Sequence, residues 1–350
     1  MGCEVSEGSG AAPGNHADAI RSDAREMWTR AIDRFRQTGV KHIVVLDDGG
    51  VMHLQMPPEV QADFKVVGIE QTTFGIAHHA MVERKMPVIN VASSAAKRHF
   101  ETPLICKAIV KRTRQIVHAH QRSCGVIGLG TIGLQLASSL REMGCQVVGY
   151  DRNQQRVEML NVQEQCESAA DVLKRAKVIF GCTGDDCLRV DDLLGIHDET
   201  RIFASCSSSD VEFRSILLSD LNWDLMGRNG TPCPTLRSYY APCKLKIKVL
   251  RSGYPINFDN SAESVPSRDI QLTRGLLFVA ALQACKMIEG DVSESVDSVM
   301  LDPTLQRAVV WAWSQHTGGR LDRIPNVEWF AKESVPFRKT RLSAGGWMDV

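Results

Sequence analysis

The stretch GVIGLGTIGLQLASSLREMGCQVVGYD, residues 125–151, decides the fold. It begins as an apolar strand, passes through Gly128-Leu-Gly130-Thr-Ile-Gly133, continues as an amphipathic helix and ends in a second apolar strand followed by Asp151. Such glycine spacing is weak evidence alone. Here it lies between a strand and a helix, and an acidic residue closes the next strand, so the stretch predicts a Rossmann-type dinucleotide-binding unit.

Each glycine has a separate physical role in this motif. Gly128 permits the tight turn, Gly130 lets a pyrophosphate approach the backbone, and Gly133 allows the helix to pack closely on the strand. Thr131 and Ile132 open the helix, whose first N–H groups can bind an anion. A Rossmann-like fold that binds no nucleotide is the alternative reading of the same pattern.

Two further positions refine the choice of cofactor. Asp151 can accept hydrogen bonds from a ribose 2′-hydroxyl, which favours NAD over NADP, although Arg152 leaves room for a phosphate. Thr183 and Gly184 follow the apolar run KVIFGC, where open parallel sheets bind ligands at their carboxyl ends. They are predicted to edge the nicotinamide ribose, and an ordinary turn is the alternative.

The rest of the chain repeats the alternation of strand and helix. Apolar strands are expected near residues 42–48, 65–70, 87–91, 177–184 and 201–207, with helices over about 22–38, 101–120 and 269–288 and a hairpin over 244–258 that turns at Ser252-Gly253. This order predicts an α/β protein, with a Rossmann-type doubly wound parallel sheet and a second α/β substrate domain. The expected division is a disordered tail over 1–18, a substrate and catalytic domain over 19–100 completed by 266–350, and an NAD-binding domain over 101–265.

Composition limits the partners. The 41 basic and 41 acidic residues balance, so no attraction to nucleic acid or an acidic membrane surface is expected, and a small molecule is the expected partner. Eleven cysteines without a CxxC pair indicate reduced thiols in a cytoplasmic protein. The histidines lack metal-ligand neighbours, so we expect no metal site. Whether the opening MGCEVS is ever lipidated stays open.

Three charged residues are candidates for chemistry. Asp48 ends a strand before two glycines, which is more often a turn than a catalytic base. Lys97 and Glu101 lie four residues apart, but with lysine first the pair stabilises a helix by only a few tenths of a kcal/mol. A base that takes the hydroxyl proton during hydride transfer is a better explanation for these residues.

Several segments resemble the S-adenosylhomocysteine hydrolases, in the same order, between about His42 and Asn257. They are VLDDGG at 45–50, GIEQTTFG at 68–75, INVASSAAKRHFETPLIC at 89–106 and SSDVEF at 208–213. The resemblance implies a tightly held NAD that oxidises a ribose hydroxyl, permits elimination and addition beside the ketone, and is regenerated in each turnover. It implies catalytic roles for Asp48, Lys97, Glu101, Gln71 and Cys106, and NAD contacts for Thr72, Thr73, Thr102 and Asn257.

The departures from that pattern define the expected function. Gln71 stands where the family has a glutamate, Thr102 replaces an asparagine, Ser208 replaces a histidine, and an N-terminal segment is absent. We therefore expect an NAD-dependent enzyme that oxidises a secondary hydroxyl of a nucleoside- or sugar-like molecule, and no efficient S-adenosylhomocysteine hydrolysis. The resemblance also implies a homo-oligomer.

Two alternatives remain. Residues 125–151 resemble the D-2-hydroxyacid dehydrogenases at least as well, which implies net dehydrogenation. Those enzymes carry an arginine after the fifth strand and a downstream His–Glu pair, whereas this chain has no arginine there before Arg214, and His197 and His316 lack a suitable setting. The other alternative is an NAD-sensing protein without catalysis. The sequence leaves open the substrate, the stereochemistry, the oligomeric state and whether the reaction is redox-neutral.

Overall fold

The computed structural model describes residues 16–79, 86–194, 196, 200–207, 211–218, 223–224, 236–240, 246–257, 265–290, 298–335, 339–341 and 347–349. The chain divides into unit 1, Asp18–Glu101 with Pro266–Val350, and unit 2, Thr102–Val265. The predictions for the first 15 residues, His197 and Ser208 lie outside the described residues.

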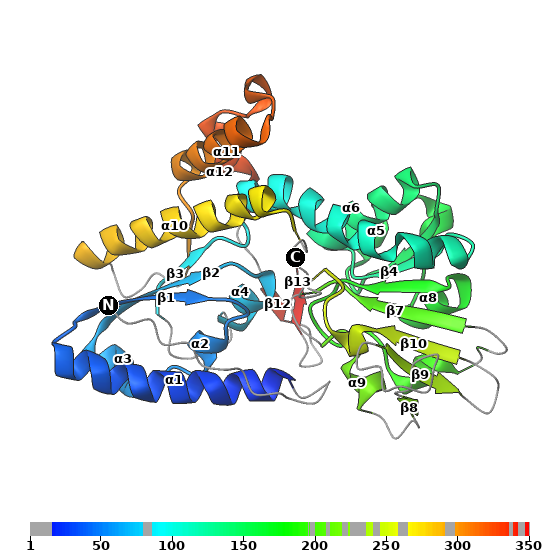
Figure 1. Cartoon of the computed structure of the whole chain (residues 1–350), viewed down its shortest axis with the longest axis horizontal. Coiled ribbons are helices and arrows are strands. Elements are labelled where there is room, and N and C mark those ends of the chain that lie inside the picture. The colour runs from blue at the N-terminus through cyan, green and yellow to red at the C-terminus, as the bar shows by residue number, and fades with distance from the viewer. Residues whose placement is uncertain are drawn as a thin grey trace. The chain divides into compact units, whose positions relative to one another are not determined.

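Unit 1 is built on a four-stranded parallel sheet. Its strands are β1 (His42–Asp47), β2 (Lys65–Glu70), β3 (Val88–Asn90) and β11 (Ser298–Met300), in the order β1-β2-β3-β11. Five of the six residues of β2 are buried, as expected for a strand paired on both sides. The long helices α1 (His16–Thr38) and α10 (Ser267–Glu289) cover opposite faces of this sheet (Figure 1).

The two long helices bury apolar stripes. In α10 the buried residues Leu272, Leu276, Ala280, Ala284 and Ile288 recur every four positions. From α1, Trp28 and Ile32 join the core cluster formed by β1, β2 and β3. Shorter helices complete unit 1: α2 (Val51–Leu54), α3 (Pro58–Asp63), α4 (Thr73–His79), the π-helix η1 (Lys97–Glu101), α11 (Pro303–Thr317) and α12 (Val327–Glu333), with an antiparallel pair β12 (Lys339–Arg341) and β13 (Trp347–Asp349).

Unit 2 contains a seven-stranded sheet in the order β5-β4-β6-β7-β10-β9-β8. Its strands are β4 (Ser123–Ile127), β5 (Gln146–Tyr150), β6 (Val178–Gly181), β7 (Thr200–Ser205), β8 (Trp223–Asp224), β9 (Leu236–Tyr240) and β10 (Lys246–Leu250). The first five in this order are parallel, and β9 and β8 pair antiparallel at one edge.

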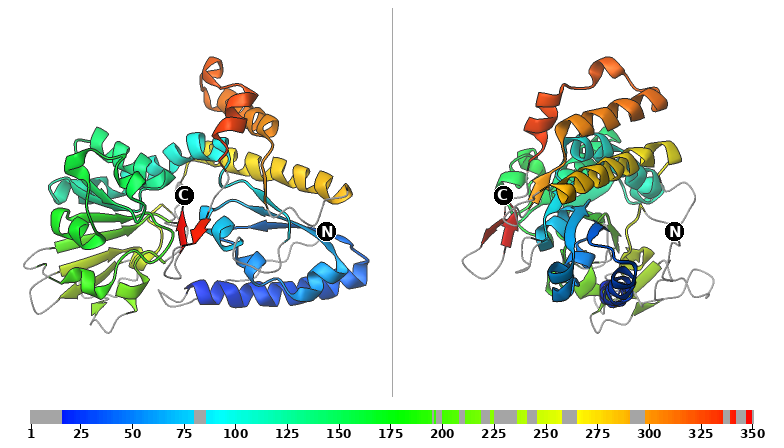
Figure 2. Two further views of the ribbon diagram at one scale, coloured as in Figure 1. Left: turned by 180° about the vertical axis from the view of Figure 1, so that it is seen from behind. Right: turned by 90° about the vertical axis from the view of Figure 1, so that its left-hand side faces the viewer.

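Helices lie on both faces of the unit 2 sheet, visible from behind in Figure 2. The core on one face contains residues of α5 (Thr102–Ala119) and α6 (Thr131–Glu142), and the core on the other contains residues of α8 (Ala169–Arg175) and α9 (Arg214–Leu217). The short α7 (Gln154–Val157) follows β5. The predicted α/β class with a Rossmann-type parallel sheet is therefore confirmed.

The predicted hairpin over residues 244–258 is wrong. After β10 the chain enters a short 3-10 helix, Arg251–Gly253, in which Ser252 has a φ of 52°. Instead of pairing with a following strand, β10 pairs antiparallel with β9, the strand that precedes it, and parallel with β7, which lies about 40 residues earlier in the sequence. The helices α11 and α12 were also not expected, because their apolar patterns are short. Among the described residues, no helix combines the length and apolar character that crossing a membrane requires.

Candidate functional site

The glycine loop of unit 2 lies between β4 and α6. Gly128 has a φ of 91°, and a Cβ there would meet the Cys182 carbonyl carbon at 2.7 Å. A Cβ on Gly133 would overlap the Gly128 carbonyl oxygen, so only glycine lets α6 begin this close to the turn. These two glycines shape the loop itself.

Gly130 differs from its neighbours because its side-chain position is open. A Cβ there would find only an Arg156 nitrogen, 4.0 Å away. Gly130 is also the N-cap of α6, and it supplies no side chain to satisfy the N–H groups at the helix start, where Thr131 and Ile132 lie. An open approach to uncapped N–H groups fits the pyrophosphate of a dinucleotide.

Asp151 holds the glycine loop. Its Oδ2 accepts a hydrogen bond from Leu129 N at 2.6 Å, and its Oδ1 accepts one from Asn153 N at 2.8 Å. Arg156, which the sequence did not single out, places Nη1 3.6 Å from Asp151 Oδ2. Arg152 is exposed and pairs loosely with Asp185, at 4.0 Å. The ribose contact of Asp151 stays a prediction.

Asn257 carries a buried polar atom without a partner. Its side chain is only 4% exposed, and Oδ1 has no hydrogen-bond partner among the described residues. The backbone bond from Ile256 N to Ser205 O, 2.9 Å, places this turn at the carboxyl end of β7. An unsatisfied amide oxygen at the ligand-binding end of the sheet fits a donor supplied by a bound cofactor.

Cys106 and Thr102 lie on α5 in unit 2. Both are buried, and the Cys106 Sγ donates to Ile132 O at 3.6 Å. Burial raises the pKa of the Cys106 thiol far above its ordinary value. A neutral buried thiol is a poor nucleophile, so this position favours packing against α6 over covalent chemistry.

The predicted Lys97–Glu101 pair forms in unit 1. The Lys97 Nζ lies 2.7 Å from Glu101 Oε2, and both side chains are largely buried. Thr273 on α10 donates its hydroxyl hydrogen to the other oxygen, Oε1, at 2.5 Å. The pair lies in a π-helix, an irregularity often found at functional sites. Thr273 could not be found from sequence because 172 residues separate it from Glu101.

Asp48 belongs to the same charged group in unit 1. Its Oδ2 accepts a hydrogen bond from Gln71 Nε2 at 3.1 Å. Desolvation raises the pKa of Asp48, while the Gln71 hydrogen bond and the positive charge of Lys97 oppose this shift and Glu101 adds to it. The structure thus brings Asp48, Lys97 and Glu101 within electrostatic reach of one another, although 49 residues separate Asp48 from Lys97.

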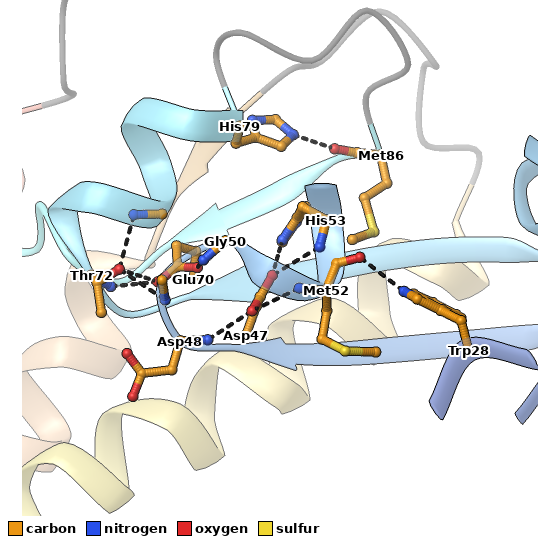
Figure 3. A network of polar contacts seen from close by, with 12 residues as sticks. Trp28, Asp47, Asp48, Gly50, Met52, His53, Glu70, Thr72, His79 and Met86 are labelled. Atoms are coloured by element: carbon orange, nitrogen blue, oxygen red, sulfur yellow. Dashed lines mark hydrogen bonds and ion pairs between the residues drawn. The ribbon is translucent and has the colours of Figure 1, made fainter. Parts of the chain in front are cut away.

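The turn that carries Asp48 is fixed by a buried polar network (Figure 3). Glu70 accepts from Thr72 N at 2.6 Å, Gly50 N at 2.8 Å and Gly49 N at 3.2 Å. The Thr72 hydroxyl donates to Glu70 at 2.7 Å and accepts from Gly75 N at 2.9 Å. Through these hydrogen bonds, Thr72 stabilises the turn that carries Asp48.

The neighbouring Thr73 is exposed at the start of α4. For both Thr72 and Thr73, a role in binding NAD stays a prediction. The carboxylate of Asp48 points away from the buried network in Figure 3, leaving it available to other groups.

Asp47, His53 and Glu70 offer three possible metal-ligand atoms within 4.8 Å of one another. Asp47 Oδ2 already faces His53 Nδ1 at 2.5 Å, and its two oxygens accept three backbone N–H bonds. The remaining His53 nitrogen, Nε2, has no partner among the described residues and lies against Gly68. This arrangement favours a structural network that anchors the turn over an ion site.

Comparison with known proteins bears on unit 2 most directly. Residues 93–184 match the family model described as D-isomer specific 2-hydroxyacid dehydrogenase, NAD binding domain. Uncharacterized proteins from two strains of Mycobacterium tuberculosis, CDC 1551 / Oshkosh and H37Rv, are each 29% identical over 285 residues, which is 76% of this chain and 52% of theirs. The chain thus spans about half the length of the curated relatives that it matches.

Solved structures give more distant likenesses. A 2-hydroxyacid dehydrogenase from Ketogulonicigenium vulgare Y25 is 14% identical, over 74% of this chain and 85% of that one, with a TM-score of 0.40. A D-lactate dehydrogenase from a Sporolactobacillus species is 14% identical, over 79% and 95%, with a TM-score of 0.36. At these scores neither likeness indicates a function for this chain.

The family match corrects the resemblance drawn from short motifs. The matched model covers Lys97, Glu101 and the glycine loop, and it describes a dehydrogenase domain, so assignment to the S-adenosylhomocysteine hydrolases is wrong. The expected transient oxidation with elimination and addition on a nucleoside- or sugar-like substrate is withdrawn with it. NAD as the cofactor is confirmed, and the expected hydrolase or lyase chemistry is not supported.

Proposed function

We propose that this chain is an NAD-dependent dehydrogenase of the D-2-hydroxyacid type, which interconverts a small secondary alcohol and its ketone. The observation that carries the proposal is the match of residues 93–184 to the NAD-binding domain of that family, together with the open approach over Gly130. NAD, when bound, accepts the hydride from the carbon that carries the hydroxyl. The protein must supply the partner for the hydroxyl proton.

Lys97 is the proposed proton partner. In reduction its ammonium group donates a proton to the carbonyl oxygen, and in oxidation its amine accepts the hydroxyl proton. Glu101 Oε2 lies 2.7 Å from Lys97 Nζ and holds the amine in place, and Thr273 fixes the orientation of Glu101. The carboxylate of Asp48 interacts electrostatically with Lys97, and Gln71 donates a hydrogen bond to the Asp48 carboxylate.

The test measures how fast the full chain reduces 2-oxo acids with NADH. The loss of NADH absorbance reports the rate. Lys97→Ala is expected to lower kcat about 10²-fold or more, because proton transfer by a positioned side chain typically accelerates a reaction by that factor. Lys332→Ala, an exposed lysine on α12, is the matched control and should leave kcat unchanged. Equal kcat values for Lys97→Ala and the unmodified chain would remove Lys97 from the mechanism.

The partner and assembly state follow as part of the same proposal. A small hydroxy or oxo acid is the proposed substrate, in place of a nucleoside. A homo-oligomer remains the expectation, and light scattering after size-exclusion chromatography measures it. If NADH binds but no hydroxy or oxo acid is turned over in either direction, the dehydrogenase proposal fails while the NAD site stands.

A further inference from the structure

Unit 2 contains a buried carboxyl group that the proposed reaction does not use. Glu212, in the turn before α9, is fully buried. One of its oxygens accepts a hydrogen bond from Gly184 N at 2.7 Å, and the other accepts one from the Thr183 hydroxyl at 2.8 Å. Glu212 therefore holds the loop that follows β6.

That loop touches the glycine turn. A Cβ on Gly128 would lie 2.8 Å from Thr183 Cγ2 and 2.7 Å from the Cys182 carbonyl carbon. Glu212 also lies under the end of β6, since a Cβ on Gly181 would meet its Oε2 at 2.9 Å. A chain of direct contacts thus runs from Glu212 through Thr183 to the first glycine of the dinucleotide loop.

The loop that Glu212 holds lies at the end of the sheet where a dinucleotide binds, so the charge of Glu212 can act on the cofactor. The loop begins at the carboxyl end of β6, beside the end of β4, and parallel sheets bind dinucleotides in the crevice at these ends. The nicotinamide ring is positively charged in NAD⁺ and neutral in NADH. A carboxylate buried beside that crevice interacts with the charge of the ring through protein of low effective dielectric. That interaction is stronger than it would be in water.

We infer that Glu212 is a positioning residue of the NAD site, and that its carboxylate charge sets the preference of the site for the oxidised over the reduced cofactor. The inference concerns cofactor binding and does not rest on the proposed dehydrogenase reaction. Neither the substrate nor Lys97 enters it.

The titratable groups around Glu212 identify it as the source of any pH effect near neutrality. Burial raises the pKa of Glu212 to about 7, against hydrogen bonds from Gly184, Thr183, Ser207 and Cys187 that favour the carboxylate. The three thiols that face it, Cys182, Cys187 and Cys206, have raised pKa values. Burial is the main cause for Cys187 and Cys206, and for Cys182 the main cause is the hydrogen bond that its thiol donates to Cys206. They stay uncharged between pH 6 and 8.

The nearby acidic groups on the same loop have other partners. Asp185 lies 4.0 Å from Arg152, and Asp186 accepts hydrogen bonds from the backbone and hydroxyl of Ser215. Burial also raises the pKa of Asp186, and the hydrogen bonds from Ser215 oppose that rise. Glu212, whose pKa is raised to about 7, is the carboxyl group whose protonation is expected to respond between pH 6 and 8.

The experiment measures the dissociation constants of NAD⁺ and NADH separately, by calorimetry on the full chain, at pH 6, 7 and 8. For the unmodified chain we expect the ratio of the NADH to the NAD⁺ constant to rise at least threefold from pH 6 to pH 8, as the carboxylate forms. In Glu212→Gln the ratio should stay constant with pH and equal the value of the unmodified chain at pH 6. Glu158→Gln, an exposed carboxylate of unit 2, is the control and should follow the unmodified chain.

A purely structural role would weaken both cofactors equally and leave their ratio independent of charge. The inference is overturned if the unmodified chain and Glu212→Gln give the same ratio at all three pH values. If Glu212→Gln does not fold, Thr183→Val provides a second test of the inference. It is expected to weaken both cofactors at least threefold while keeping the pH dependence of the ratio, and unchanged binding in that variant would also contradict the positioning role.

Discussion

Glu101 and Glu212 are both acceptors of a threonine hydroxyl, but their surroundings differ. Glu101 faces the ammonium group of Lys97, whereas the neighbours of Glu212 are hydroxyl groups, thiols and a backbone N–H. A carboxyl group that is buried among neutral groups keeps its proton to a higher pH than an exposed one. The two residues are therefore suited to different tasks, charge stabilisation at Lys97 and response to pH in unit 2.

Glu212 should also make stability depend on pH. Its pKa is raised from 4.5 to about 7 in the folded chain, so the folded state holds a proton that the unfolded state has lost. This contribution is present below pH 4.5 and is lost as the pH rises through 7. Between pH 5 and 8 it amounts to roughly 2 kcal/mol, and Glu212→Gln should remove it.

Urea unfolding at pH 5, 6, 7 and 8 measures this difference. Glu158→Gln is again the control, because its carboxylate is exposed. A free energy of unfolding that changes with pH by the same amount in Glu212→Gln and in the unmodified chain would show that Glu212 does not titrate in this range.

At the scale of residues, sequence reasoning found the groups that follow strand ends and missed those brought in from a distance. Asp48, Lys97 and Glu101 were identified from local spacing, and the structure places them together. Thr273 and Glu212 act across 172 and 28 residues, through side chains whose direction only tertiary packing decides. No periodic pattern marks such residues.

The junction of β4 and α6 is the element on which cofactor binding depends. Because a Cβ on Gly130 meets no atom closer than 4.0 Å and its φ is −71°, Gly130→Ala should fold with a free energy of unfolding within about 1 kcal/mol of the unmodified chain. The methyl group would nevertheless occupy the space through which a pyrophosphate approaches, and NAD affinity should fall at least tenfold.

Calorimetric titration with NAD and thermal unfolding distinguish the two effects. Gly133→Ala is the contrasting variant, since its Cβ would overlap the Gly128 carbonyl oxygen and should destabilise the fold itself. Unchanged NAD affinity in a folded Gly130→Ala protein would mean that the dinucleotide does not lie across this loop.

In unit 1, α4 depends on a close backbone approach. A Cβ on Gly75 would overlap the Glu70 carboxylate and lie 2.6 Å from Gly50 N. Gly75→Ala should therefore destabilise the chain by about 2 kcal/mol or more, because the buried Glu70 would lose hydrogen bonds. Gly290→Ala is the control, as its nearest neighbour would be 3.5 Å away. Denaturant unfolding would contradict this account if the two variants were equally stable.

Elements were predicted well where the apolar period is long and less well where pairing is distant. The strands from residue 42 to residue 205, the helix over 102–119 and the helix over 267–289 were expected from periodicity. The run KIKVL was expected to pair with the segment after it, but β10 pairs with the preceding β9 and with β7, whose sequence lies more than 40 residues earlier. A local turn signal cannot reveal such a partner.

The whole chain is organised around separate apolar cores. Trp28 and Phe64 belong to the core of unit 1, and Phe180 and Phe203 belong to the cores of unit 2. We therefore expect two steps in denaturant unfolding. NAD at 100 times its dissociation constant should stabilise the step that belongs to unit 2 by about 2.7 kcal/mol.

Tryptophan fluorescence and circular dichroism can separate these steps. Five of the six tryptophans lie in unit 1, so a Trp223→Phe chain reports unit 1 by fluorescence while dichroism reports both units. One transition, in which both signals move together with and without NAD, would show that the units unfold cooperatively.

The parallel pairing of β11 with β3 joins segments that are about 200 residues apart. During synthesis on the ribosome, all of unit 2 emerges before the last strand of the unit 1 sheet is made. The outer edge of β3 therefore stays unpaired until β11 has been translated. Unpaired strand edges associate readily with other chains. The nascent protein has the strongest need for chaperones in that interval, after unit 2 can already have folded.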